Sequence, residues 1–165
     1  MQRLYLIRHA KSSWADERLA DFHRPLKTRG VKAAEAMGAR LAAAGIVPQL
    51  IVSSPAVRAR STAVIIADGV GCAVEGIVYD EGLYLGSEEY HYELLGTLFG
   101  GVDEIFLVGH NDTISFVAAH LCGRDLGNVP TCGIVAIEYG AGGFSAQKGA
   151  GRLLFFWYPK DQGGG

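Results

Sequence analysis

Short apolar runs alternate with segments of helical periodicity along most of this chain. The runs are three to six residues long, and short apolar runs of this kind are typical of buried strands. The expected strands are residues 4–7, 50–52, 73–78, 105–108, 134–139 and 153–158. Apolar positions at helical spacing occupy segments between them, at residues 29–44, 56–67, 88–98 and 113–121. The alternation through residue 121 predicts an α/β fold with a mostly parallel sheet.

Two connections depart from this alternation. The glycine-rich stretch 140–151 is short and has no helical pattern, so the strands on either side are expected to form an antiparallel hairpin at an edge of the sheet. Residues 11–27 are polar and aperiodic and predict an ordered loop or a short helical turn, and long connections of this kind are commonly functional. The role of His23 within it stays open. We expect one domain over residues 1–160 and a flexible tail over 161–165.

Composition narrows the class of protein. The chain has 165 residues, 49% of them apolar and 19% charged, which excludes a wholly disordered chain. A net charge of −2 carries no global signature of nucleic-acid or anionic-membrane binding, and no apolar run approaches the ~20 residues that span a bilayer. Cys72, Cys122 and Cys132 match no zinc or redox spacing. Reduced, mostly buried thiols in a cytoplasmic protein are expected.

Polar side chains follow three of the predicted strands. The first strand ends in Arg8 and His9, and the second is followed by a helix whose first turn carries Arg58. The strand that begins near residue 105 leads into His110 and Asn111. The carboxyl ends of parallel strands meet at one edge of a sheet, and neighbouring strands are ~4.8 Å apart. These side chains can therefore converge on one small ligand.

This set of side chains suits a phosphate group. Arg8 and Arg58 can bind a tetrahedral oxyanion through paired hydrogen bonds, and the helix N-terminus at Arg58 also favours an anion. One histidine can attack phosphorus as a neutral imidazole while the other donates to the phosphate oxygens. No group of residues near them suggests a metal site.

Each of these residues also has a structural interpretation. A histidine at a strand end is commonly solvated, and an arginine in a first helical turn is commonly a surface charge. Asn111 and Asp112 could cap the helix that follows them. The joint occurrence at three strand ends favours a functional site over these alternatives. His91 and His120 lack such a placement and are expected to be at the surface or partly packed.

Several short motifs lie in order between residues 3 and 139. They are Arg8-His9-Ala10, Arg24-Pro25-Leu26, Thr28-Arg29-Gly30, Ser53-Ser54-Pro55 with Arg58 and Thr62, and Val108-Gly109-His110. The ordered set resembles the histidine phosphatase superfamily, and the small size together with the second and third motifs looks most like its SixA-type phosphohistidine phosphatase branch. The Arg-His pair is a weak signal by itself, whereas the set in this order is strong.

The resemblance implies a phosphoglycerate-mutase-like fold, with a central, mostly parallel sheet and helices on both faces. It implies a phosphatase that needs neither a metal nor another cofactor. His9 would be the nucleophile and become transiently phosphorylated, and Arg8, Arg58 and His110 would form the phosphate pocket around it. Further candidates for phosphate binding are Arg24 and Asn111.

The general acid is the uncertain part of the resemblance. Larger relatives use a carboxylate to protonate the leaving oxygen, and the candidates here by sequence order are Asp80 and Glu81. An alkoxide needs such an acid, whereas the nitrogen of a phosphoramidate can be protonated beforehand. An uncertain acid therefore fits a phosphohistidine substrate, and phosphohistidine on a protein is the preferred substrate under this resemblance.

Three other functions remain open at this point. One is a small-molecule phosphomonoesterase of the same superfamily, and another is a non-catalytic phosphate-binding module. A mutase-like phosphate transfer is the weakest of the three. A nucleic-acid or membrane partner is not expected.

Overall fold

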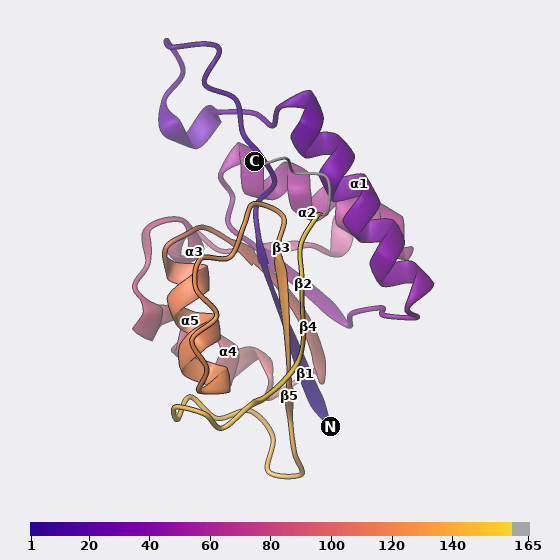
Figure 1. The fold of residues 1–165 in the computed structure, drawn as a ribbon, viewed down its shortest axis with the longest axis vertical. Helices are drawn as coiled ribbons and strands as arrows, with labels where there is room; N and C mark the ends of the chain where they lie inside the picture. The colour runs from indigo at the N-terminus through magenta and orange to yellow at the C-terminus, as the bar shows by residue number, and fades with distance from the viewer. Residues whose placement is uncertain (160–165) are drawn as a thin grey trace.

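A six-stranded sheet forms the centre of the computed structural model, which describes residues 1–159 (Figure 1). Its strands are β1 (Gln2–Arg8), β2 (Leu50–Ser53), β3 (Val78–Tyr79), β4 (Glu104–Gly109), β5 (Ile134–Tyr139) and β6 (Arg152–Trp157). The α-helices are α1 (Thr28–Ala43), α2 (Val57–Val70), α3 (Gly82–Leu85), α4 (Glu88–Leu98) and α5 (Thr113–Cys122). Two short 3-10 helices are η1 (Asp21–His23) and η2 (Val74–Gly76).

The strand order is β3-β2-β4-β1-β5-β6. β1 and β2 both pair with β4 in parallel, and β3 pairs with β2 in parallel, so the predicted mostly parallel α/β sheet is confirmed. β5 runs antiparallel to both of its neighbours, β1 and β6. The hairpin expected from the last two strands is therefore confirmed. The reversed strand β5 lies one position in from the edge, and β6 forms the edge itself.

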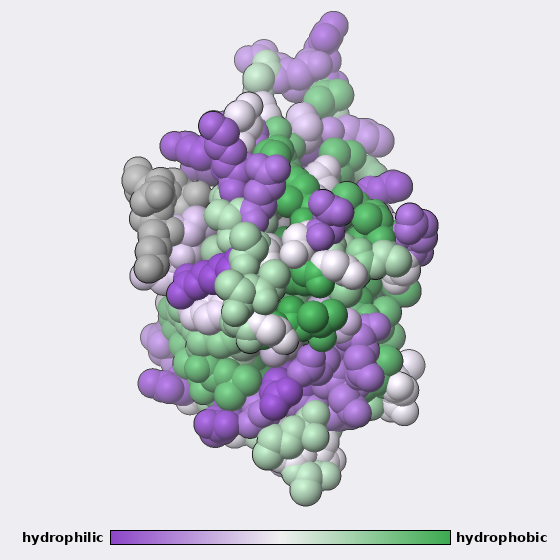
Figure 2. Space-filling model, turned by 90° about the vertical axis from the view of Figure 1, so that its right-hand side faces the viewer, coloured by the Kyte–Doolittle hydropathy of each residue, from purple (hydrophilic) through white to green (hydrophobic). Residues whose placement is uncertain are grey.

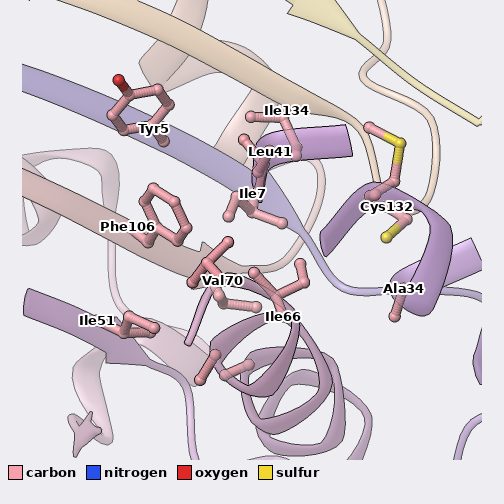
Figure 3. Close-up of a cluster of buried hydrophobic side chains, with 14 of the residues drawn as sticks. Tyr5, Ile7, Ala34, Leu41, Ile51, Ile66, Val70, Phe106, Cys132 and Ile134 are labelled. Atoms are coloured by element: carbon pink, nitrogen blue, oxygen red, sulfur yellow. The ribbon is translucent and has the colours of Figure 1, made fainter. Parts of the chain in front are cut away.

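Side chains of β1 alternate between two hydrophobic cores. Tyr5 and Ile7 pack with α1 and α2 on one face of the sheet, in the cluster that Figure 3 shows. Leu4 and Leu6 pack with α4 and α5 on the other face. All four side chains are buried. The double burial explains why the strand has no polar break, and it confirms helices on both faces of the sheet (Figure 1).

The neighbouring strands β1 and β4 lead into helices on opposite faces of the sheet. α1, which follows β1, lies against one core, and α5, which follows β4, lies against the other. Such a reversal opens a crevice at the carboxyl ends of the two strands, where ligands bind in open α/β sheets. The register pairs Arg8 with Gly109, so His9 and His110 leave the sheet at the same level.

The prediction of a strand at residues 73–78 is largely wrong. Half of that segment, Val74–Gly76, forms η2, and β3 makes only two pairs with β2, Val52 with Val78 and Ser53 with Tyr79. Gly76 interrupts the apolar pattern, and β3 is the outermost strand of the sheet on that side. A strand at an edge has a ladder partner on one side alone, so less of this segment is held in extended form.

α2 begins within one residue of the expected start and ends later than expected. Ala56 is the N-cap, and the helix runs from Val57 to Val70, past the predicted end at residue 67. Ser54, just before it, accepts a hydrogen bond from the Ala56 amide through its Oγ, at 3.2 Å. Arg58 still lies in the first turn, as predicted. The flexible tail expected at residues 161–165 lies outside the described residues.

Residues 11–27 form an ordered loop, as predicted. The loop contains η1, and its two arms meet in an antiparallel bridge between Ser12 and Leu26. It projects from the upper end of the molecule in Figure 1, and the same end is mostly hydrophilic in Figure 2. Below it, Figure 2 shows apolar residues gathered in the middle of the side that carries α1. Within residues 1–159, the helices are too short or too polar to cross a membrane.

Gly30 allows α1 to pack against the first residues of this loop. A Cβ at Gly30 would collide with the backbone carbonyl oxygen of Lys11, which cannot move like a side-chain tip. We expect Gly30→Ala to lower the free energy of unfolding by about 1–3 kcal/mol, measured by urea denaturation.

Gly96→Ala is the matched control for Gly30→Ala. Gly96 lies inside α4, and a Cβ there would have nothing within 4 Å. Alanine at this position is expected to raise the free energy of unfolding by about 0.5–1 kcal/mol, because it restricts the unfolded chain and favours the helix. Equal effects of the two substitutions would contradict the steric account.

Candidate active site

His9 lies just beyond the end of β1, and the residue is 8% exposed. Its Nδ1 is 2.7 Å from the carbonyl oxygen of Ala10. A carbonyl oxygen can only accept a hydrogen bond, so Nδ1 carries the proton and donates. The other ring nitrogen, Nε2, therefore keeps its lone pair and is available as a nucleophile.

Two segments distant in sequence hold the backbone around His9. The Ala10 amide donates to Thr62 Oγ1 of α2 at 2.9 Å, and that hydroxyl donates in turn to the carbonyl of Arg58 at 2.8 Å. The Cys132 amide lies 3.0 Å from the Arg8 carbonyl oxygen and 3.1 Å from the carbonyl oxygen of His9. Cys132 adopts a left-handed backbone with φ of 60° to do so. Its thiol is buried, and burial raises the pKa of that thiol to about 12. Cys122 is also buried and Cys72 is partly buried, so the mostly buried cysteines expected from the sequence are confirmed.

His110 faces His9 from the end of β4. The two ring centroids are 5.2 Å apart, and the ring of Tyr84 meets His110 edge-on at 5.5 Å. The His110 Nε2 is 2.8 Å from Ser54 Oγ at the end of β2. The other nitrogen, Nδ1, is buried and has no partner among the described residues. The three strand ends singled out in the sequence therefore meet in space.

Both histidines are neutral at neutral pH. Burial lowers the pKa of His9 to about 4, against the hydrogen bond to the Ala10 carbonyl, and the charges of Arg58 and Arg8 lower it further. Burial lowers the pKa of His110 to about 3, with a further lowering from His9 and Arg58. A neutral imidazole is the form that can attack phosphorus.

Arg8 and Arg58 present unpaired donors at the same place. Arg8 donates from Nη1 to the Val129 carbonyl at 2.9 Å, which leaves its buried Nε without a partner within residues 1–159. The Nε of Arg58 is likewise buried and unpaired there. Together with His110 Nδ1, three buried nitrogens lack partners in one small region. Buried polar groups are normally paired, so these nitrogens fit the oxygens of a bound oxyanion.

The cleft around these residues has a volume of about 560 Å³ and a strongly cationic lining. It contains His9 and His110 and five basic residues, and no carboxylate from the described part of the chain lines it. The basic residues are Arg8, Lys11, Arg24, Lys27 and Arg58. This charge distribution favours an anionic ligand.

Asp21 is a central residue of the site that sequence reasoning missed. Its carboxylate accepts hydrogen bonds from Arg58 Nη2 at 2.9 Å, Arg24 Nε at 3.2 Å and the Tyr84 hydroxyl at 2.6 Å, and its backbone carbonyl accepts one from Arg58 Nη1 at 2.7 Å. The Tyr84 hydrogen bond, followed by Arg58, holds the pKa of Asp21 well below its usual range. In the sequence, Asp21 is one polar residue among many in a loop. Only the fold brings it to the arginines.

Arg24 and Asn111, the further candidates for phosphate binding, both line the cleft. Arg24 is buried and donates from Nη1 to Ser12 Oγ at 2.7 Å. The Asn111 Oδ1 accepts from the Ser115 amide at 3.2 Å and from the Ser115 hydroxyl at 2.7 Å. Asn111 lies one residue before the N-cap Asp112 and accepts both hydrogen bonds from the first turn of α5, so it has the capping role that was the structural alternative while it also borders the cleft.

Asp80 and Glu81, the candidates for a general acid, are not among the residues that line the cleft. The Asp80 Oδ1 accepts hydrogen bonds from the Gly82 amide at 2.8 Å and from the Tyr90 hydroxyl at 2.7 Å. These contacts hold the turn into α3. The chain passes from β3 into α3 and α4 here, and the structure does not bring either carboxylate to His9.

The remaining histidines lie elsewhere. The expectation of a surface or partly packed position is wrong for His91, which is 1% exposed in α4 and has Nδ1 2.7 Å from the Ser87 carbonyl. His120 is partly buried, as expected, with Nε2 2.8 Å from the Ala146 carbonyl. His23 is exposed beside Phe22 and does not line the cleft. Residues 1–159 contain no group of three or more His, Cys, Asp or Glu side chains that could hold a metal ion.

Comparisons with known proteins show which family this chain resembles. The family model of the histidine phosphatase superfamily (branch 1) matches residues 4–84. A solved structure assigned to the SixA phosphohistidine phosphatases, from Agrobacterium tumefaciens, is 30% identical with a TM-score of 0.83, over 96% of this chain and 98% of that one. The structure of the protein histidine phosphatase SixA complexed with tungstate is 20% identical with a TM-score of 0.83, over 96% and 97%. A chloroplastic protein of Arabidopsis thaliana is 48% identical over 61 residues, which are 37% of this chain and 28% of that protein.

The chain therefore belongs to the histidine phosphatase superfamily, a class of phosphatases. Within the superfamily its place is the SixA-type branch, because the 30% identity to the Agrobacterium chain extends over nearly the whole of both proteins. The phosphoglycerate-mutase-like fold expected from the motifs is confirmed as well.

The low pKa values of the two site histidines predict a particular pH dependence of stability. The unfolded chain binds protons on these rings below the ordinary pKa of 6.5, whereas folded His9 does so only near 4 and His110 near 3. The two neutral rings therefore make their full contribution to the free energy of unfolding above pH 6.5, and this contribution is lost as the pH falls toward 4. Ring nitrogen NMR should show both imidazoles neutral at about pH 5. His9→Gln should make the free energy of unfolding, measured by urea denaturation, depend less steeply on pH between 6.5 and 4. An unchanged dependence on pH would contradict the lowered pKa of His9.

Asp21 is expected to position the guanidinium groups of Arg58 and Arg24. Asp21→Asn keeps the size of the side chain and removes its charge, so both arginines lose the anion that orients them. We expect kcat/KM to fall by about 10- to 100-fold, since small errors in the position of binding groups have large effects on rate. Asp16→Asn, at an exposed ion pair with Arg18 in the same loop, should leave kcat/KM within about twofold, in keeping with the small worth of exposed ion pairs. Equal kinetics of Asp21→Asn and wild type would argue against this role.

Proposed function

We propose that the protein hydrolyses phosphohistidine on a protein substrate, through a phosphoenzyme formed on His9. The observation that carries the proposal is the meeting of a neutral His9, whose Nε2 holds a lone pair, with three buried nitrogens that lack partners among the described residues. Those nitrogens are Arg8 Nε, Arg58 Nε and His110 Nδ1.

In the first step, His9 Nε2 forms a bond to phosphorus as the bond from phosphorus to the leaving nitrogen breaks. Negative charge on the equatorial oxygens is then stabilised by Arg8, Arg58 and His110. The Nδ1 hydrogen bond of His9 to the Ala10 carbonyl holds the ring in the attacking orientation and stabilises the positive charge of the phosphorylated imidazole. In the second step, water attacks phosphorus, the bond to Nε2 breaks, and inorganic phosphate leaves.

The chemistry of the leaving group supports a phosphorus–nitrogen substrate. A leaving alkoxide needs a proton from a general acid, and no carboxylate of the described chain lines the cleft. In phosphohistidine, the ring nitrogen that is not bonded to phosphorus can be protonated before the bond breaks, so the leaving group departs as a neutral imidazole. Asp80 and Glu81 stay predictions for an acid, and the proposed cycle does not require either of them.

A protein substrate is supported by the relative from Agrobacterium tumefaciens, which is assigned to the phosphohistidine phosphatases. A small phosphomonoester is the second candidate, because the cationic lining of the cleft recognises the phosphoryl group itself and any phosphate ester carries one. A non-catalytic module is disfavoured, because a lapsed enzyme has no need of both histidines and both arginines.

Incubation with a protein that carries radiolabelled phosphohistidine tests the proposal. Wild type should release phosphate and pass through a phosphoenzyme that is labile in acid and stable in alkali. Turnover of phosphohistidine should exceed turnover of a panel of alkyl phosphomonoesters. The same order should hold with and without a metal chelator.

Variants of the site residues define the mechanism. His9→Ala should abolish both the labelled intermediate and turnover, and Arg58→Ala should lower the rate by about 10²- to 10³-fold. His120→Ala, a histidine outside the cleft, is the matched control and should retain normal turnover. Normal turnover by His9→Ala would exclude the phosphoenzyme, and faster hydrolysis of the alkyl esters would favour the second candidate.

A further inference from the structure

We propose that Trp14 forms a subsite for the leaving group, in which the indole ring stacks on a planar ring attached to the phosphoryl group. The inference rests on the proposed function for the position of the phosphoryl group, and it adds a preference among substrates. The preferred substrates are those whose leaving group is a planar ring, such as an imidazole joined to phosphorus through nitrogen.

The exposure of Trp14 is the first observation. Trp14 is 70% exposed, although tryptophan is highly buried on average. It borders the same cleft as His9 and Arg58. A large aromatic ring exposed at the border of a ligand site is a candidate for contact with that ligand.

Arg24 supports the ring from one side. The Arg24 guanidinium carbon lies 3.5 Å from the centroid of the Trp14 ring, which is a cation–π contact. Arg24 itself is buried and is held by hydrogen bonds to Asp21, Ser12 and the Ser13 carbonyl. The indole therefore rests on a fixed base, and its large exposure shows that much of the ring remains free for a ligand.

The same contacts place the ring relative to the phosphate pocket. Arg24 touches both Trp14 and Asp21, and Asp21 binds Arg58. Arg58, Asp21, Arg24 and Trp14 are therefore linked by consecutive contacts, and Arg58, Arg24 and Trp14 of this series line the cleft. A volume of about 560 Å³ lies in the range of sites that hold small organic ligands, so a ring can occupy the cleft beside the phosphate.

Stacking on indole separates substrates by shape. A planar ring gains an offset-stacked or edge contact with Trp14, and a protonated imidazole adds attraction to the ring face. An ammonia or alkyl leaving group gains neither. From the usual strength of aromatic pairs, the expected preference for a ring is about 3- to 10-fold.

Binding of phosphonates tests the subsite without any turnover. Phenylphosphonate and methylphosphonate share the charged group and differ in the ring, and neither is hydrolysed. Wild type should bind phenylphosphonate about 3- to 10-fold more tightly, Trp14→Ala should lose this preference, and Trp14→Phe should keep most of it. Phe116→Ala, which removes an exposed ring from α5 away from the cleft lining, is the control and should keep the wild-type ratio.

A pair of substrates tests the same subsite during turnover. Phosphoimidazole and phosphoramidate both contain a phosphorus–nitrogen bond, and only the first carries a ring. The ratio of their kcat/KM values should fall about 3- to 10-fold in Trp14→Ala, mainly through a higher KM for phosphoimidazole. The Phe116→Ala ratio should equal that of wild type.

The two experiments separate this inference from the proposed function. If wild type releases no phosphate from the phosphohistidine protein, the proposed function fails, and the phosphonate ratios still decide the role of Trp14. If Trp14→Ala keeps the wild-type preference for phenylphosphonate, the subsite is refuted whatever the turnover. Loss of the preference in Trp14→Ala alone supports it.

Discussion

The parallel pairing of β1 with β4 is the constraint on which the site depends. Its register sets Arg8 opposite Gly109, and that alone brings His9 and His110 to the same level. A slip of one residue would draw a charged or polar terminal residue toward the apolar interior, which is costly without a partner. The cores on both faces of the sheet therefore fix the geometry of the site as well as the stability of the fold. The helices that follow the two strands depart to opposite faces and leave the crevice open.

Burial at this crevice sets the charge state of the site. Removing water from around His9 and His110 keeps both rings neutral, and the nearby arginines reinforce the effect. The same removal of water leaves the arginine donors in need of an anion. Asp21 balances part of the positive charge of Arg58 and Arg24, while no carboxylate of residues 1–159 lines the cleft itself. A nucleophile that stays uncharged beside an anion-binding group is the combination that phosphoryl transfer to histidine requires.

The loop at residues 11–27 has a larger part in the site than its sequence indicates. It supplies Asp21, Arg24 and Trp14, and it is anchored by the bridge between Ser12 and Leu26. Its polar, aperiodic composition predicts order only weakly. The order arises from contacts to Arg58 of α2 and Tyr84 of α3, which lie far away in the sequence. Positions of this kind have no local pattern that could reveal them.

The sequence by itself determined the alternation of strands and helices, the hairpin at the end of the sheet and the meeting of Arg8, His9, Arg58 and His110. These follow from local hydrophobic pattern and from the rule that parallel strands end at one edge. It extended β3 too far and expected His91 to be at the surface or partly packed, because edge pairing and burial depend on neighbours from other elements. Only the tertiary structure decided that Asp21 joins the arginines and that Asp80 and Glu81 stay outside the cleft. The physical reason is that a side chain acquires its partners from packing across the fold, and packing between distant segments leaves no periodic signal in the chain.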